Sequence, residues 1–162
     1  MDAINIVVGG MDCGSTPIMP YVGGRNDGAY FTRMCKLYLQ AALLRCGFDV
    51  VDIAGDVTEP QDVALTANRH TADAAIVVSY CAFGSRKSFN DIGGRVVRYA
   101  AGRSYVRSRM LCEDICAKLC GVGECRIESD GIFGAAGCPT ATVDAGYLTQ
   151  FDEARLVYDP DY

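Results

Sequence analysis

Histidine is scarce in this sequence, basic residues are outnumbered, and no apolar run is long. The 162 residues include one histidine, and 15 Lys and Arg stand against 20 Asp and Glu, which gives a formal net charge of −5. That charge argues against nucleic acid or an anionic membrane surface as the main partner. No apolar run reaches the roughly 20 residues that a transmembrane helix needs. The sequence therefore predicts neither a nucleic-acid-binding protein nor a membrane protein.

A secretory signal is also missing from the start of the sequence. Residues 1–10 carry no basic cluster and no long apolar stretch, and they lead directly into a predicted strand. We therefore expect synthesis in the cytoplasm, with incorporation into a spore layer or release by lysis as routes out of the cell.

The composition that is present is typical of one globular domain. Half of the residues are hydrophobic and 22% are charged, so the chain is expected to be globular rather than disordered. A chain of this length builds a sizeable core without disulfide or metal support. We predict a single domain over residues 1–162.

Predicted strands and helices alternate along the sequence. The continuous apolar run 74–80 is typical of a central strand that is covered on both faces. The alternation predicts an α/β three-layer sandwich, with a mostly parallel central sheet and helices on both faces. The expected strands are 5–8, 48–53, 74–80, 94–99 at the sheet edge, and 140–143; the expected helices are 29–46, 60–70, 105–120 and a short one after Gly146-Tyr147-Leu148.

Four segments follow one another in an informative order. The closing stretch 138–158 places a Pro before a buried strand, a carboxylate at the strand's end, and Gly-Tyr-Leu before a short helix. The earlier segments are a first strand with its glycine loop at 6–14, an Ala-Asn segment leading into the central strand at 67–79, and a Ser-x-x-Leu helix at 108–119. In order and spacing, the set resembles the zinc-dependent N-acetylmuramoyl-L-alanine amidases, which are bacterial cell-wall autolysins. The resemblance covers almost the whole chain and implies an amidase-like α/β fold.

The resemblance also implies where a catalytic zinc site would lie. In such a site the ion lowers the pKa of a bound water, and a carboxylate takes the water's proton. The single histidine, His70, belongs to the Ala-Asn helix, matches no ligand position, and is expected to be an exposed helix residue. The positions that correspond to the family's histidine, glutamate and histidine ligands and to its catalytic glutamate are Met11, Asp27 or Gly28, Cys81 and Asp144.

These residues are a poor match to hydrolytic zinc. Asp27 and Cys81 supply two ligands at best, and the thioether of Met11 with a thiolate would suit copper(I) better than zinc. We therefore predict a packed pocket without a metal, and no cofactor. Asp144 holds the family's catalytic position, and a structural, hydrogen-bonded carboxylate is the alternative role for it.

The sequence has nine cysteines, an unusual number for a chain without a secretory signal. Free cysteine is among the most buried residue types, so core packing is the first expectation. Cys112, Cys116 and Cys120 recur every four residues and form one ridge of a predicted helix, beside a ridge of Leu and Ile that we expect to make the main core contact. Surface thiols in such a row would suit covalent cross-linking between subunits. The residues predicted for that role are Cys116, Cys120 and Cys125.

Seven Lys and Arg residues make the region 86–109 basic within an acidic protein. Such a region is usually a solvated face. The alternative is that it meets an acidic face of a neighbouring copy, because segregated charge suits head-to-tail association.

The leading functional hypothesis is non-catalytic. Because the zinc-ligand positions are not occupied by zinc ligands, we predict a degenerate amidase homologue that is not an enzyme and acts as a structural, self-assembling subunit or a peptidoglycan-related binding protein. The expected partners are further copies of the chain, a peptidoglycan fragment, or a cell-wall or spore-layer protein. The alternative is a divergent peptidoglycan amidase that hydrolyses the N-acetylmuramoyl-L-alanine bond, with Asp144 as general base and an unorthodox metal site at Asp27 and Cys81.

Overall fold

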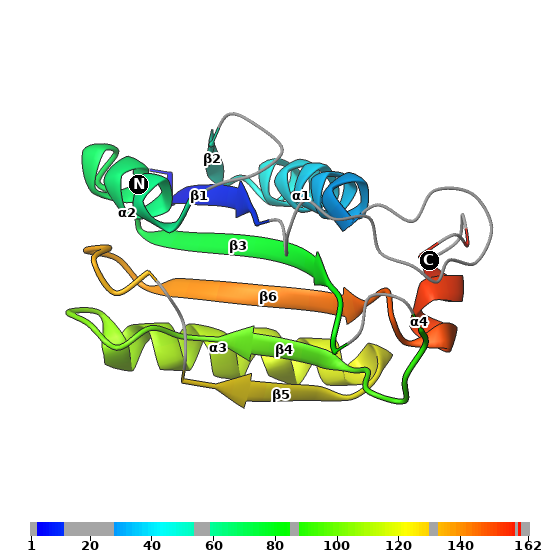
Figure 1. The fold of residues 1–162 in the computed structure, drawn as a ribbon. Coiled ribbons are helices and arrows are strands. Elements are labelled where there is room, and N and C mark those ends of the chain that lie inside the picture. The colour runs from blue at the N-terminus through cyan, green and yellow to red at the C-terminus, as the bar shows by residue number, and fades with distance from the viewer. Residues whose placement is uncertain are drawn as a thin grey trace.

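The computed structural model describes residues 3–11, 28–53, 59–84, 88–129, 133–157 and 159. These residues form a six-stranded sheet with helices on both faces (Figure 1). The predicted three-layer α/β class is confirmed. The elements are β1 (Asn5–Gly10), α1 (Gly28–Arg45), β2 (Asp49–Asp52), α2 (Pro60–Arg69), β3 (Ala74–Cys81), β4 (Arg95–Arg98), α3 (Tyr105–Leu119), the 3-10 turn η1 (Cys120–Val122), β5 (Cys125–Glu128), β6 (Thr140–Tyr147) and α4 (Phe151–Leu156).

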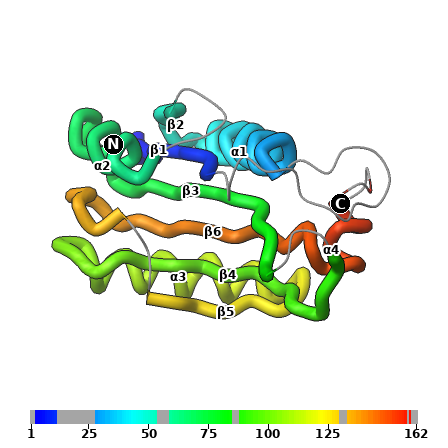
Figure 2. The backbone as a smooth tube through the Cα atoms, viewed as in Figure 1, coloured from blue at the N-terminus to red at the C-terminus, as the bar shows by residue number. Residues whose placement is uncertain are grey.

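The strand order is β2-β1-β3-β6-β4-β5, and the sheet is mostly parallel. The strands β2, β1, β3 and β6 run parallel, whereas β4 pairs antiparallel with β6 and parallel with β5. The carboxyl ends of β1, β3 and β6 therefore lie at the same edge of the sheet, where α4 also lies (Figure 2). In parallel α/β sheets this edge is the usual place for a ligand or active site.

The core is divided between the two faces of the sheet. On one face, α1 and α3 pack against a cluster that includes Val78, Val97 and Val143. On the other face, α2 and the segment 133–138 pack against a cluster that includes Val7 and Val77. Within the described residues no helix is both long and apolar enough to cross a membrane.

Two predictions about the strands were wrong. The strand at 94–99 was expected at the sheet edge, but β4 lies between β6 and β5, so β5 is the edge strand. The strand β5 was not predicted, because Cys125–Glu128 is short and alternates Cys, Arg, Ile and Glu without a continuous apolar run. The parallel partner β5, which places β4 inside the sheet, is therefore visible only in the folded structure.

Several residues that carried the sequence resemblance hold the fold together. The side-chain amide of Asn68 donates to the carbonyl of Ala135 at 3.2 Å, and its oxygen accepts from the Gly137 amide at 2.7 Å. The buried Ser108 hydroxyl accepts from the Thr140 amide at 2.9 Å, which fixes the start of β6 against α3. The motifs therefore correspond to structural contacts between elements.

Candidate functional site

Asp144 lies within β6, three residues before the strand ends. Its neighbour Val143 packs into the cluster shared with α1 and α3, so Asp144 faces the opposite side of the sheet, because successive side chains alternate along a strand. In the register of the sheet it lies beside Ser79 of β3 and Val96 of β4. Asp144 is only 2% exposed. The expected carboxylate therefore lies near the carboxyl end of β6, but its side chain is buried.

Both oxygens of the Asp144 carboxylate have partners. The Ser79 hydroxyl donates to Oδ1, and the Arg98 guanidinium forms a salt bridge with Oδ2. Arg98 in turn donates through Nε to Glu128 at 3.0 Å, and Arg126 donates to the other oxygen of Glu128 at 3.1 Å. The chain of charges Asp144–Arg98–Glu128–Arg126 thus joins β6, β4 and β5 on one face. We call it the ionic chain.

The electrostatics of Glu128 reflect its place between two arginines. Partial burial acts to raise the pKa of its carboxyl, but hydrogen bonds and charge from Arg126 and Arg98 outweigh that effect and lower the pKa below its usual value. A carboxylate whose pKa is lowered on folding stabilises the protein above its unfolded pKa and loses this contribution as the pH falls through the folded pKa. The Glu128 carboxylate is therefore charged at neutral pH, as its pairing with Arg98 and Arg126 requires.

The residues at the predicted zinc-ligand positions do not fit a zinc ion. Gly28 begins α1 and has no side chain to offer, and Asp27 lies outside the described residues. Met11 packs against the core cluster of the α2 face and offers only a thioether. Cys81 takes part in a disulfide bond, and a sulfur in a disulfide has no thiolate to bind a metal. Its sulfur lies 3.6 Å from both Ser79 Oγ and Asp144 Oδ1.

No cluster of three or more His, Cys, Asp or Glu with metal-binding geometry occurs in the part of the chain that the structure describes. His70 is exposed at the end of α2 and lies at none of the site positions. The structure thus brings Asp144 and Cys81 together, with Ser79 between them, and leaves His70 outside. Zinc hydrolysis needs three protein ligands around an open position, and the described residues do not supply them.

Arg98 and Ser79 are the site residues that the sequence reasoning missed. Arg98 was grouped with a basic region that was expected to be solvated or to meet another copy, yet it is paired inside the sheet, and Arg95 is also buried. Arg103, Arg107 and Arg109 are exposed, as expected for a solvated face. The signal that could have separated them is the Arg-Val-Val-Arg pattern of β4, because alternation places Arg98 on the face opposite Val97.

The cysteine ridge of α3 lies partly in the core, as first expected, and Cys120 at its end is exposed. Cys112 and Cys116 are buried, whereas the neighbouring Leu111, Ile115 and Leu119 are only partly buried. The expectation that the Leu and Ile ridge makes the main core contact was wrong, because α3 presents its smaller side chains where it approaches the sheet. Cys112 as a core residue is confirmed, and burial raises the pKa of its thiol to about 12.

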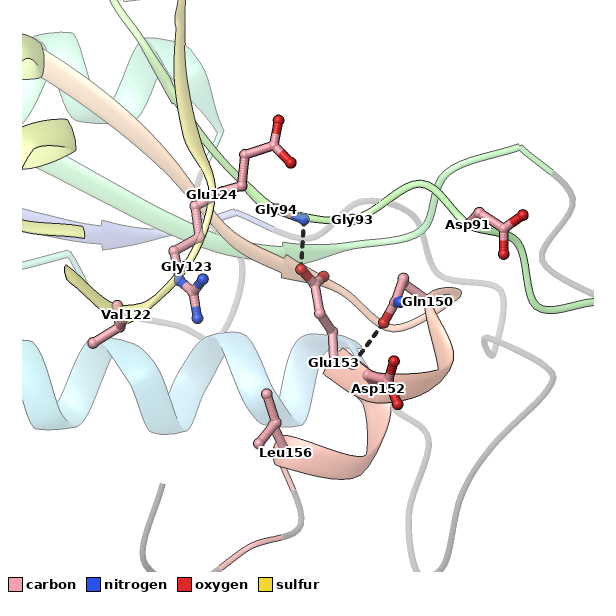
Figure 3. A pocket seen from close by; sticks show the side chains of 11 residues that line it. Asp91, Gly93, Gly94, Val122, Gly123, Glu124, Gln150, Asp152, Glu153 and Leu156 are labelled. Atoms are coloured by element: carbon pink, nitrogen blue, oxygen red, sulfur yellow. Dashed lines mark hydrogen bonds between the residues drawn. The ribbon is translucent and has the colours of Figure 1, made fainter. Parts of the chain in front are cut away.

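A hollow of about 320 Å³ lies between the start of β4, the turn into β5, and α4 (Figure 3). Glu153 fills part of it and uses its carboxylate to accept from the Gly94 amide at 2.5 Å and the Tyr147 amide at 2.6 Å. The Gln150 side chain caps α4 by accepting from the Glu153 amide at 2.7 Å. The described residues that line the hollow include none of Met11, Cys81 and Asp144. The hollow is therefore stabilised by hydrogen bonds to α4 side chains, and Asp144 does not line it.

No protein-family model matches the sequence, and no curated protein is significantly similar to it in sequence. Solved structures do match. An N-acetylmuramoyl-L-alanine amidase from Clostridium difficile 630 gives a TM-score of 0.77 at 14% identity, over 100% of this chain and 89% of its own. The amidase Ami1 from Mycobacterium smegmatis gives 0.71 at 18% identity, over 98% and 88%. The amidase CwlD from Clostridioides difficile, in complex with the GerS lipoprotein, gives 0.71 at 15% identity, over 96% and 88%.

These matches show that the chain has the fold of N-acetylmuramoyl-L-alanine amidases from end to end. The resemblance inferred from four short motifs is confirmed at the level of the fold. At these identities the likeness establishes the fold alone, so activity has to be argued from the site.

Proposed function

We propose that this protein is a non-catalytic member of the amidase fold that acts as a structural, self-associating subunit of a cell-wall or spore-layer assembly. The observation that carries the non-catalytic part is the salt bridge between Arg98 and the buried Asp144. A general base must reach a water and accept its proton. In this protein the Asp144 oxygens are held by Ser79 and Arg98, within a sheet that leaves the carboxylate almost no exposed surface.

The first test is hydrolysis of purified peptidoglycan. We expect no release of peptide stems above background, with or without added zinc, because Met11, Gly28 and Cys81 do not form a zinc site. The readout is mass spectrometry of soluble fragments, with a catalytically active amidase of the same fold as positive control. Metal content of the purified protein is measured on the same sample by elemental mass spectrometry, and we expect less than about 0.1 zinc per chain, against about one in a catalytic site.

The matched variant for this test is Asp144→Asn, which keeps the size of the side chain and removes its charge. Peptide release by the natural sequence that is lost in Asp144→Asn would contradict the non-catalytic proposal and favour the divergent amidase. Release that persists in Asp144→Asn would be assigned to a contaminating enzyme.

Self-association is supported by the outer side of α1. Residues at spacings of four and three form an apolar stripe that faces away from the sheet; Leu37 is 46% exposed and Leu44 is 58% exposed. The inner side of the same helix includes the buried polar residues Thr32 and Lys36. The stripe consists of Tyr30, Met34, Leu37, Ala41 and Leu44.

A second copy of the chain is the occupant that this stripe fits. If two α1 helices cross antiparallel about Leu37, Tyr30 of one copy meets Leu44 of the other, and Met34 meets Ala41, so large side chains face smaller ones. No charged residue interrupts the stripe. Alternating spacings of three and four are the pattern that packs one helix against another, and an interface around a two-fold axis must be self-complementary.

Leu37→Glu is expected to abolish self-association. Two carboxylates would face each other at the two-fold axis, and we expect the dissociation constant of the dimer to rise at least about 100-fold. Light scattering after size exclusion, over a range of concentrations in reductant, measures it. Leu65→Glu is the matched control, because Leu65 is a 61% exposed leucine on α2, away from the stripe. A natural protein that is monomeric at high concentration, or a Leu65→Glu variant with the same defect, would contradict the proposal.

A further inference from the structure

Three thiols meet where α3 ends and β5 begins. Cys116 is buried in the core cluster beneath α3, and Cys125 of β5 packs against the same cluster while remaining partly exposed. Cys120 is exposed at the end of the helix, in the 3-10 turn that connects the two elements. The three residues are therefore brought together from a helix, a turn and the edge strand of the sheet.

The contacts single out Cys116 and Cys125 as a pair. Cys125 packs against the core cluster that contains Cys116, and neither sulfur is in a disulfide. The sulfur of Cys120 lies 3.9 Å from the backbone carbonyl of Cys125, so it approaches the same residue from the solvent side. Among the described residues, no group of three or more His, Cys, Asp or Glu side chains could hold a metal ion, and this holds for the three cysteines too. Its available chemistry is therefore that of thiols.

We propose that Cys116 and Cys125 form a disulfide bond within one chain when the protein meets a small-molecule disulfide, and that the exposed Cys120 is the thiol that reacts first. The thiolate of Cys120 attacks the small disulfide, forms a mixed disulfide and releases one small thiol. Cys125 then attacks the Cys120 sulfur and releases the second small thiol. Cys116 finally attacks the Cys125 sulfur and returns Cys120 as a free thiol.

The reaction is balanced by its oxidant. Two S–H bonds, those of Cys116 and Cys125, are lost and one S–S bond is formed, while the small disulfide is reduced to two thiols that carry away both protons. The order of steps follows from accessibility and thiolate supply. Burial and the neighbouring Cys116 thiol raise the pKa of Cys125 to about 12, which makes Cys125 a slow first nucleophile toward an external disulfide.

The product would fasten the edge strand to the helix beneath it. An edge strand exposes unpaired backbone groups and is the part of a sheet most prone to open or to pair with another chain. β5 also carries Glu128, through which the ionic chain reaches the sheet edge. The disulfide would therefore hold β5, whose Glu128 pairs with Arg98, covalently against α3. This inference does not depend on the proposed function, since an active amidase would have the same three thiols.

Non-reducing peptide mapping tests the proposal on the full chain. Reduced protein is treated with excess oxidised glutathione, quenched with an alkylating reagent, and digested by proteases that cut after Lys118 and after Glu124, which places the three cysteines on three separate peptides. We expect a peptide pair that joins Cys116 to Cys125 in chains that have no disulfide to another chain. Cys120→Ala should give the same pair at least about tenfold more slowly. Cys46→Ala, which removes an exposed cysteine elsewhere, should leave the rate unchanged.

Other products would overturn the proposal. Dimers joined through Cys120 as the main product would support cross-linking between chains, the role first predicted for these cysteines. Protein in which Cys116 and Cys125 both remain alkylated after prolonged oxidation would show that the pair does not react. An unchanged rate in Cys120→Ala would remove Cys120 as the entry point. Because the natural sequence itself gives the peptide pair, the test does not depend on a variant that folds poorly.

Discussion

Replacing Arg98 with methionine is expected to lower the free energy of unfolding by about 3–5 kcal/mol. Methionine keeps much of the length of the side chain and removes the charge that faces Asp144. The Asp144 carboxylate would then remain buried with only the Ser79 hydroxyl as a partner, and a buried charge without its counter-charge is strongly destabilising. Urea denaturation followed by circular dichroism measures the change.

Two further variants separate this effect from loss of packing. Adding Asp144→Asn to Arg98→Met removes the stranded charge, so the double variant is expected to recover part of the lost stability. Arg109→Met removes an arginine from an exposed pair with Glu113 on α3 and should change stability little. A double variant that is no more stable than Arg98→Met would show that the lost stability came from packing rather than from the unpaired carboxylate.

Gly134→Ala is expected to destabilise the protein by about 3 kcal/mol, at the upper end of overpacking effects. A Cβ atom at Gly134 would lie 2.2 Å from the backbone carbonyl oxygen of Ala101, and one at Gly102 would lie 2.3 Å from the Gly134 carbonyl oxygen. Backbone atoms cannot rotate away as a side chain can, so the connection after β4 and the segment before β6 would have to separate. Thermal unfolding should show a midpoint lower by about 10 °C.

The control for this variant is Gly121→Ala in the turn η1. A Cβ atom there would meet nothing within 4 Å, so we expect stability close to that of the natural sequence. Gly134→Ala with an unchanged unfolding midpoint would show that the two backbones are not in contact in solution. Equal losses in both variants would point to a general cost of replacing glycine.

Much of the fold could be predicted from the order of short patterns. The apolar runs at β1, β3 and β6 identified the buried strands, because strands covered on both faces need continuous apolar side chains. The half-polar strand β5 was missed, since its stability comes from pairing with β4 and from packing on α3. Local sequence patterns do not report such non-local partners.

The sequence by itself determined the α/β class and the likeness to the amidase fold. It also placed a carboxylate at position 144, but it could not assign a role to it. Only the tertiary structure shows the partner of Asp144, because Arg98 comes from β4, 46 positions earlier in the chain, and reaches the carboxylate through antiparallel pairing. The charge state and the hydrogen bonding of a buried carboxylate depend on the charged groups that folding brings beside it. For Asp144 that group is the guanidinium of Arg98, from the same sheet.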